Sequence, residues 1–155
     1  KRHIVISTSG IVSKIIRYAD EDHKYRLAIS LNATTDKIRN QIMPLNKKWP
    51  LKELLQAVRY YTHKTGQRVT FEYALMAGIN DSLEDAERLQ KLVNGLRCKI
   101  NLIPYNVTEG KYHRPSEEQI IQFYKKMAAL RAPVTIRWSK GDDIAAACGQ
   151  LAVRS

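Results

Sequence analysis

A cysteine near the end of the sequence lies among residues that shape the backbone rather than fill a core. Cys148 stands in the stretch GDDIAAACGQLA, residues 141–152, and is one of only two cysteines in the chain. A cysteine beside small apolar residues usually packs like a small hydrophobe, but once ionised it is a nucleophile. The other cysteine, Cys98, directly precedes an apolar run and is predicted to be core. Cys148 is therefore a candidate nucleophile, with inert packing as the alternative.

Small polar residues follow several apolar runs, and their hydroxyl and amide groups could hold a ribose or an amino-acid moiety. They are Ser7 to Gly10 in STSG, Ser30 and Asn32 in SLN, Asn80 and Asp81, and Asn106. The alternatives are structural, because STSG could cap a helix and the strand-end residues could satisfy backbone groups. Glu72 interrupts an apolar run, so we expect it either at a solvated edge or in a polar interior. The four histidines show no metal-ligand spacing.

Strand-like and helix-like segments alternate along the chain. The β-branched runs predict strands at residues 3–7, 25–31, 68–75, 99–105 and 134–138. Helical patterns fall between them, at residues 10–20, 34–43, 50–66, 82–95 and 116–131. This alternation predicts right-handed βαβ units, and thus an α/β fold with a parallel sheet and outer helices. Five strands are too few for a closed eight-stranded barrel.

The positions of the polar residues relative to these strands indicate a single site. In parallel α/β folds, ligands bind beyond the carboxyl ends of the strands. Ser7 and Ser30 lie at the ends of predicted strands, and Asn80, Asn106 and the SKGDD stretch before Cys148 follow such strands. We therefore expect them on one face of the molecule.

The composition indicates a globular domain with an anionic partner. The 155 residues, 44% of them apolar, suit one domain over residues 1–155. The net charge is +11, which favours nucleic acid, with a solvated basic surface as the alternative. No apolar run is long enough for a membrane span and no signal peptide is evident, so we expect a cytoplasmic protein with free thiols.

Six segments carry a resemblance to a known family. They are ISTSGIV, LAISLNATTDKIRNQIMPLNKK, VTFEY, GINDS, CKINLIPYN and GDDIAAACGQLA. In this order they resemble the C-terminal half of the catalytic barrel of the RlmN family, radical S-adenosylmethionine (SAM) enzymes that methylate adenine C2 in 23S rRNA and tRNA. The resemblance implies a partial radical SAM (β/α) barrel that lacks its N-terminal half.

The resemblance also implies a site and a mechanism. The positions that match SAM contacts are Ser7, Ser30, Leu31, Asn32 and Asn106, although many members of the family have His where Asn32 stands. Cys148 matches the cysteine that takes a methyl group from SAM. A second SAM, reduced at a 4Fe-4S cluster, then yields a 5′-deoxyadenosyl radical that activates this methyl group for addition to adenine. A second cysteine resolves the resulting crosslink to RNA.

Several features of the family are missing from the sequence. The CxxxCxxC cluster motif, the glycine-glutamate SAM loop, the resolving cysteine and the N-terminal RNA-binding region do not occur. The resemblance therefore implies a fragment that holds no metal ligands, is inactive alone and self-associates through unpaired strand edges, whereas the full-length enzyme is monomeric.

Other functions stay open at this point. Within the class, the chain could methylate adenine C8 rather than C2. From a different class, it could be a non-catalytic basic RNA-binding module. A phosphate-binding metabolic barrel is a third possibility, but no glycine-rich phosphate loop supports it.

Overall fold

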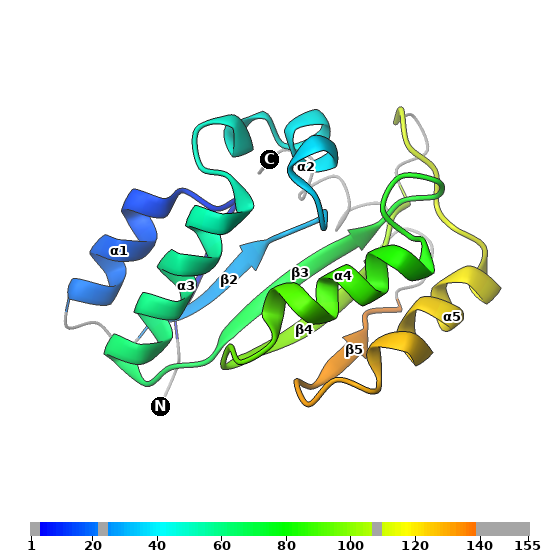
Figure 1. Cartoon of the computed structure of the whole chain (residues 1–155). Helices are drawn as coiled ribbons and strands as arrows, with labels where there is room; N and C mark the ends of the chain where they lie inside the picture. The colour runs from blue at the N-terminus through cyan, green and yellow to red at the C-terminus, as the bar shows by residue number, and fades with distance from the viewer. Residues whose placement is uncertain (1–3, 22–24, 107–109, 139–155) are drawn as a thin grey trace.

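The computed structural model describes residues 4–21, 25–106 and 110–138, and its central element is a five-stranded parallel sheet (Figure 1). The strands lie in chain order, β1-β2-β3-β4-β5. Their bounds are Val5–Thr8, Arg26–Ser30, Val69–Leu75, Cys98–Pro104 and Val134–Ile136. All four strand pairs are parallel, which confirms the predicted α/β class.

Helices connect the strands. They are α1 (Val12–Asp20), α2 (Asp36–Ile42), α3 (Leu51–Thr65), α4 (Leu83–Val93) and α5 (Glu117–Met127), with a 3-10 helix at Pro44–Lys47 between α2 and α3. Each crossover moves the chain by one strand in the same direction, so α1, α3, α4 and α5 all lie on one face of the sheet (Figure 1). This is the arrangement of a barrel wall, and over the described residues the sheet is open, with β1 and β5 at its edges.

The core lies between the sheet and these helices. Alternate residues of β3, such as Phe71 and Tyr73, are fully buried against helix residues such as Leu54 and Phe123. Successive side chains of a strand point to opposite faces, so the residues between them lie on the other face. Those residues are mostly polar, which leaves the second face of the sheet available for a site.

Local signals set most element boundaries close to the predicted ones. The Thr35 hydroxyl accepts a hydrogen bond from the Ile38 amide at 3.4 Å and so caps α2. Gly66 ends α3 with φ +69°, a conformation that favours glycine. Among the described residues, no helix is both long and apolar enough to cross a membrane.

Candidate functional site

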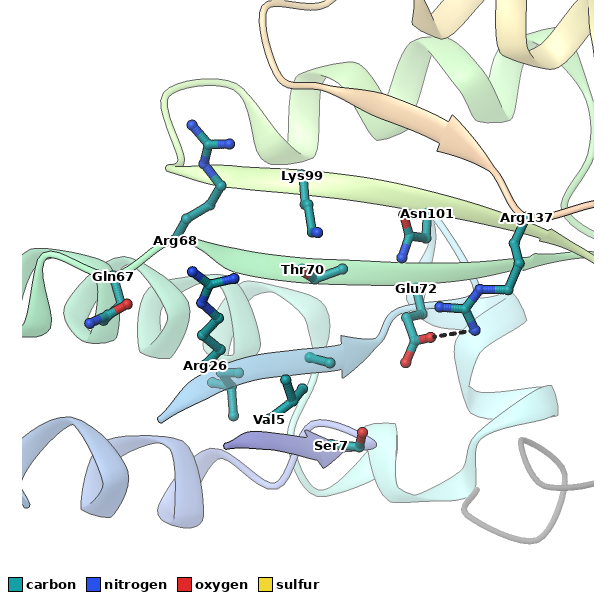
Figure 2. Close-up of a pocket in the computed structure, with 12 residues that line it drawn as sticks. Val5, Ser7, Arg26, Gln67, Arg68, Thr70, Glu72, Lys99, Asn101 and Arg137 are labelled. Atoms are coloured by element: carbon teal, nitrogen blue, oxygen red, sulfur yellow. Dashed lines mark ion pairs between the residues drawn. The ribbon is translucent and has the colours of Figure 1, made fainter. Parts of the chain in front are cut away.

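The polar face of the sheet holds a hollow of about 530 Å³ (Figure 2). Four strands and the residue after β5 contribute side chains to its lining. These include Ser7, Arg26, Thr70, Glu72, Lys99, Asn101 and Arg137. The strand register places Ser30, Glu72, Asn101 and Thr135 side by side as one row across four strands. The face away from the helices is thus a continuous polar surface.

An ion pair crosses this surface at the level of the carboxyl ends of β2 and β5. Glu72 on β3 and Arg137 after β5 approach to 3.7 Å, with the Glu72 side chain 13% exposed and that of Arg137 51% exposed (Figure 2). On β4, between β3 and β5, the Asn101 side chain accepts a hydrogen bond from Thr135 of β5. Of the two positions expected for Glu72, the structure places it in a polar interior, because β3 is the central strand.

A second hollow, of about 470 Å³, lies at the carboxyl end of β1. Its lining includes Ser7, Ser9 and Ser30, together with Lys14 and Tyr18 of α1. Ser7 is exposed and lines both hollows, while Ser30 is 6% exposed. The structure therefore brings two of the predicted cofactor-binding residues to one place.

The two residues after Ser30 are built into the fold. Leu31 is fully buried in the core; its amide donates to the Glu72 carbonyl at 2.9 Å, and its own carbonyl accepts from Arg39. Asn32 has φ +61°, and its side-chain oxygen accepts from the Ala74 amide at 2.8 Å. The Asn32 side chain thus ties the end of β2 to β3, and its predicted contact with a cofactor stays a prediction.

Asn80 is one of the strand-end residues considered for ligand binding, and the structure shows the structural alternative, in which its side chain satisfies backbone groups. It is fully buried, and its amide group donates to the carbonyls of Asn32 and Ala74 and accepts from the Met76 amide. Its role is therefore to hold the loop after β3 against the end of β2. Sequence reasoning left both roles open, because Asn is common both in loops and as a buried partner of backbone groups.

Asn106 lies apart from Ser7. Asn106 is half-buried and lies two residues beyond β4, and β4 is three strand spacings from β1. A ligand that touches both Asn106 and Ser7 would therefore span on the order of 14 Å. Cys148 lies outside the described residues. Cys98 is 3% exposed on the helix-facing side of β4, where burial raises its pKa to about 11, which confirms it as a core residue.

The site residues can be tested for their fit to the groups that the resemblance implies. Hydroxyls, an amide and a carboxylate–guanidinium pair at the strand ends suit a zwitterionic nucleoside such as SAM. A 4Fe-4S cluster does not fit this chain, because its iron atoms take three or four cysteine thiolates and the sequence has two cysteines. Among the described residues, no group of three or more metal-ligating side chains occurs.

Comparison with known proteins gives relatives by sequence and by structure. The chain is 52% identical over 151 residues to a probable dual-specificity RNA methyltransferase RlmN of Geobacillus kaustophilus, covering 97% of this chain and 41% of that protein. It is 49% identical over 152 residues to the RlmN of Anaeromyxobacter sp., covering 97% of this chain and 40% of that protein. No profile of a protein family matches the sequence.

Solved structures agree with the sequence matches. A radical SAM methyltransferase from Sphaerobacter thermophilus superposes with a TM-score of 0.88 at 47% identity, covering 95% of this chain and 43% of that one. A domain of a pyruvate-formate lyase-activating enzyme from Bacteroides vulgatus shares the fold, with a TM-score of 0.67 at 19% identity over 88% of this chain and 81% of that domain. The chain is therefore related to the RlmN family of dual-specificity RNA methyltransferases and spans about 41% of the length of such a relative.

Proposed function

We propose that this chain works as part of a SAM-dependent RNA methyltransferase that places a methyl group on adenine C2. The observation that carries the proposal is the 52% identity to an RlmN protein over nearly the whole chain. The structural match to a radical SAM methyltransferase, at 47% identity, supports the same class of chemistry. Because the chain spans about two fifths of these relatives, the proposal concerns a protein of their full length.

The described residues would bind and orient the cofactor. The Ser7 and Ser30 hydroxyls line one hollow at the strand ends and can each donate and accept a hydrogen bond. The Glu72–Arg137 pair offers one charge of each sign toward the polar face, which suits the ammonium and carboxylate of an amino-acid moiety. Bound SAM would supply the methyl group. No step is assigned to an iron–sulfur cluster, because this chain lacks the thiolates to hold one.

Cys148 would receive the methyl group. Its thiolate would attack the methyl carbon, so that a sulfur–carbon bond forms on Cys148 as the sulfonium–methyl bond breaks and S-adenosylhomocysteine leaves. The proton lost from the thiol would pass to solvent or a nearby base. Asp142 and Asp143 precede this cysteine in the sequence and would oppose its ionisation if they faced it, whereas the sulfonium charge of SAM would favour it.

The RNA partner is proposed on charge and on the names of the relatives. The net charge is +11, and basic side chains such as Arg26 and Lys99 lie exposed on the polar face (Figure 2). We propose 23S rRNA and tRNA as substrates, as the dual specificity named for the relatives would imply.

The test uses the full-length protein, reconstituted with iron and sulfide and supplied with methyl-labelled SAM and RNA. We expect 2-methyladenosine in the nuclease digest of the RNA and, in tryptic peptides after one turnover, label on Cys148. Cys148→Ala should abolish methyl transfer and keep the iron content, whereas Cys98→Ala should keep the activity. A product of 8-methyladenosine would move the target to C8. RNA binding without any methyl transfer would favour the non-catalytic module.

A further inference from the structure

Arg39 is the largest fully buried side chain of the described residues, and nothing in the proposed chemistry uses it. It lies on α2, and a charged group is seldom fully buried unless it has strong partners. Its guanidinium donates four hydrogen bonds. The acceptors are the carbonyls of Ser9 (2.7 Å), Ser30 (2.9 Å) and Leu31 (2.9 Å) and the Asn46 side-chain oxygen (2.9 Å).

The three carbonyl acceptors belong to two different strand ends, whereas Asn46 lies in the 3-10 helix. Ser9 follows β1, whereas Ser30 is the last residue of β2 and Leu31 follows it. The same Nη2 atom donates to both Ser9 and Ser30. One guanidinium therefore fixes the two segments that carry Ser7, Ser30 and Asn32, which are predicted cofactor contacts.

A second layer of contacts holds Arg39 itself. The Asn46 amide group donates to the side chains of Asp36 (3.0 Å) and Asn40 (2.8 Å), which orients its oxygen toward Arg39. Asp36 also accepts from the Leu51 amide at the start of α3. Burial lowers the Arg39 pKa to about 10, opposed by the charge of Asp36, so the guanidinium stays protonated at neutral pH.

Gly10 leaves room for this guanidinium. A Cβ atom at position 10 would lie 2.9 Å from Arg39 Nη2 and 3.4 Å from a Leu54 methyl carbon. Gly10 also has φ +113°, where any side chain would be strained. The STSG turn thus leaves space for the Arg39 guanidinium beside Gly10.

We propose that Arg39 is the positioning residue of the cofactor site, which holds residues 7–10 and 30–32 in the arrangement that binds the nucleoside and amino-acid parts of SAM. The choice of ligand rests on the proposed function; the coupling of the two segments does not. Arg39 itself does not touch the ligand, because its side chain is fully buried and four of its five N–H groups are donated within the protein. Lysine cannot replace it, since a single ammonium lacks the planar fork that reaches four acceptors.

The experiment compares Arg39→Lys with Arg59→Lys, a matched change at an exposed position of α3. Both variants are made in the full-length protein. Amide hydrogen exchange is followed by mass spectrometry in peptides that cover residues 6–12, 29–34 and 83–93, and SAM binding is followed by calorimetry. For Arg39→Lys we expect about tenfold faster exchange in both strand-end peptides and no change in α4. SAM binding should weaken at least tenfold, and Arg59→Lys should leave all of these values unchanged.

Gly10→Ala tests the same coupling from the other side, because a Cβ there would press on the guanidinium. We expect faster exchange at residues 29–34 as well as at 6–12, and we expect the combined Gly10→Ala and Arg39→Lys variant to show less than the sum of the two effects.

Three results would overturn the inference. The first is faster exchange in only one of the two strand-end peptides of Arg39→Lys. The second is an equal rise of the exchange rate in α4, which would mark a merely structural role. The third is an unchanged SAM affinity in Arg39→Lys. If the unmodified protein binds no SAM, the proposed function fails, while the exchange data still decide whether Arg39 couples the two segments.

Discussion

Cys98 shows how burial decides what a thiol can do. It lies on the helix-facing side of β4, 3% exposed among core residues such as Val69 and Leu96. Removing a thiolate from water costs more than removing a thiol, so burial raises the Cys98 pKa to about 11, with Arg68 partly opposing the shift. The thiol therefore stays protonated and inert in the folded protein at neutral pH.

This shift gives a stability that depends on pH. The unfolded chain ionises Cys98 above its ordinary pKa of 9.0, whereas the folded chain resists ionisation up to about 11. The protonated Cys98 thiol thus contributes on the order of 2 kcal/mol to the free energy of unfolding, relative to the thiolate. This contribution is complete below pH 9 and is lost as the pH rises toward 11. Urea unfolding at pH 7, 9 and 10.5 should show that Cys98→Ala is about 1 kcal/mol less stable than the unmodified protein at pH 7 and more stable than it at pH 10.5. An unchanged deficit across the series would show that the thiol titrates normally.

At the scale of elements, Asp85 joins the start of α4 to the loop after β2. Its carboxylate accepts from the Ser82 amide and hydroxyl, which completes a capping box, and from the Thr34 hydroxyl at 2.6 Å. Arg88 donates to it at 2.9 Å. Burial alone would raise the Asp85 pKa, but the hydrogen bonds from Thr34, Ser82 and Arg88 outweigh it and lower the pKa below 3.8.

Removal of this carboxylate should weaken the fold through two elements together. We expect Asp85→Ala to lower the free energy of unfolding by about 2 kcal/mol. The Ser82 cap of α4 remains, but the capping box loses the carboxylate that accepts from the Ser82 amide, and the buried Thr34 hydroxyl loses its acceptor. Because the pKa of Asp85 is lowered in the folded protein, the stabilisation by its carboxylate is complete above pH 4. It is lost as the pH falls through the pKa that Asp85 has in the folded protein.

Urea unfolding at pH 6 and pH 3 measures both effects. The unmodified protein should lose more stability between these pH values than Asp85→Ala does. Glu84→Gln, a change at the exposed neighbouring position of α4, is the control and should behave like the unmodified protein. Equal acid sensitivity of Asp85→Ala and the unmodified protein would refute the role given to this carboxylate.

At the scale of the molecule, open sheet edges and a high positive charge have opposite effects on self-association. In the described part of the chain, β1 and β5 have one strand neighbour each, and Ile4, Val5 and Trp138 near these edges are 59%, 58% and 46% exposed. Unpaired edges favour association, while the charge of +11 opposes it over a Debye length of about 10 Å at 0.1 M salt.

We therefore expect self-association of the 155-residue chain to increase with salt. Light scattering should show mostly monomer at about 0.05 M salt and larger species at about 0.5 M, where repulsion is screened. A well-folded monomer at high concentration in both buffers would contradict the prediction and would mean that the edges are protected.

RNA binding by the chain should have the opposite dependence on salt. Phosphate contacts release counterions, so we expect the affinity for a mixed-sequence RNA to fall at least tenfold between about 50 and 200 mM salt. The double variant Arg26→Gln and Lys99→Gln, at one end of the larger hollow, should flatten this slope. Lys125→Gln, on exposed α5, is the single-charge control. An affinity that does not change with salt would show that the basic excess is only a solvated surface.

The sequence by itself determined the elements and their order. Period-2 and period-3.6 patterns, the glycine that ends α3 and the apolar setting of Cys98 are local features, and they predicted five parallel strands with helices between them to within a few residues at most boundaries. The strand-end rule also placed Ser7 and Ser30 on one face, and the structure brings both to one hollow.

Only the tertiary structure decided which polar residues belong to a site and which hold the fold together. Arg39 meets Ser9 across 30 residues, and Asn80 meets Asn32 across 48, so that a loop asparagine and a helix arginine become buried supports. The Glu72–Arg137 pair likewise joins β3 to the residue after β5. Such contacts depend on how the crossovers stack the strands, and no local spacing carries that information, because the same residue types serve equally well on a solvated surface.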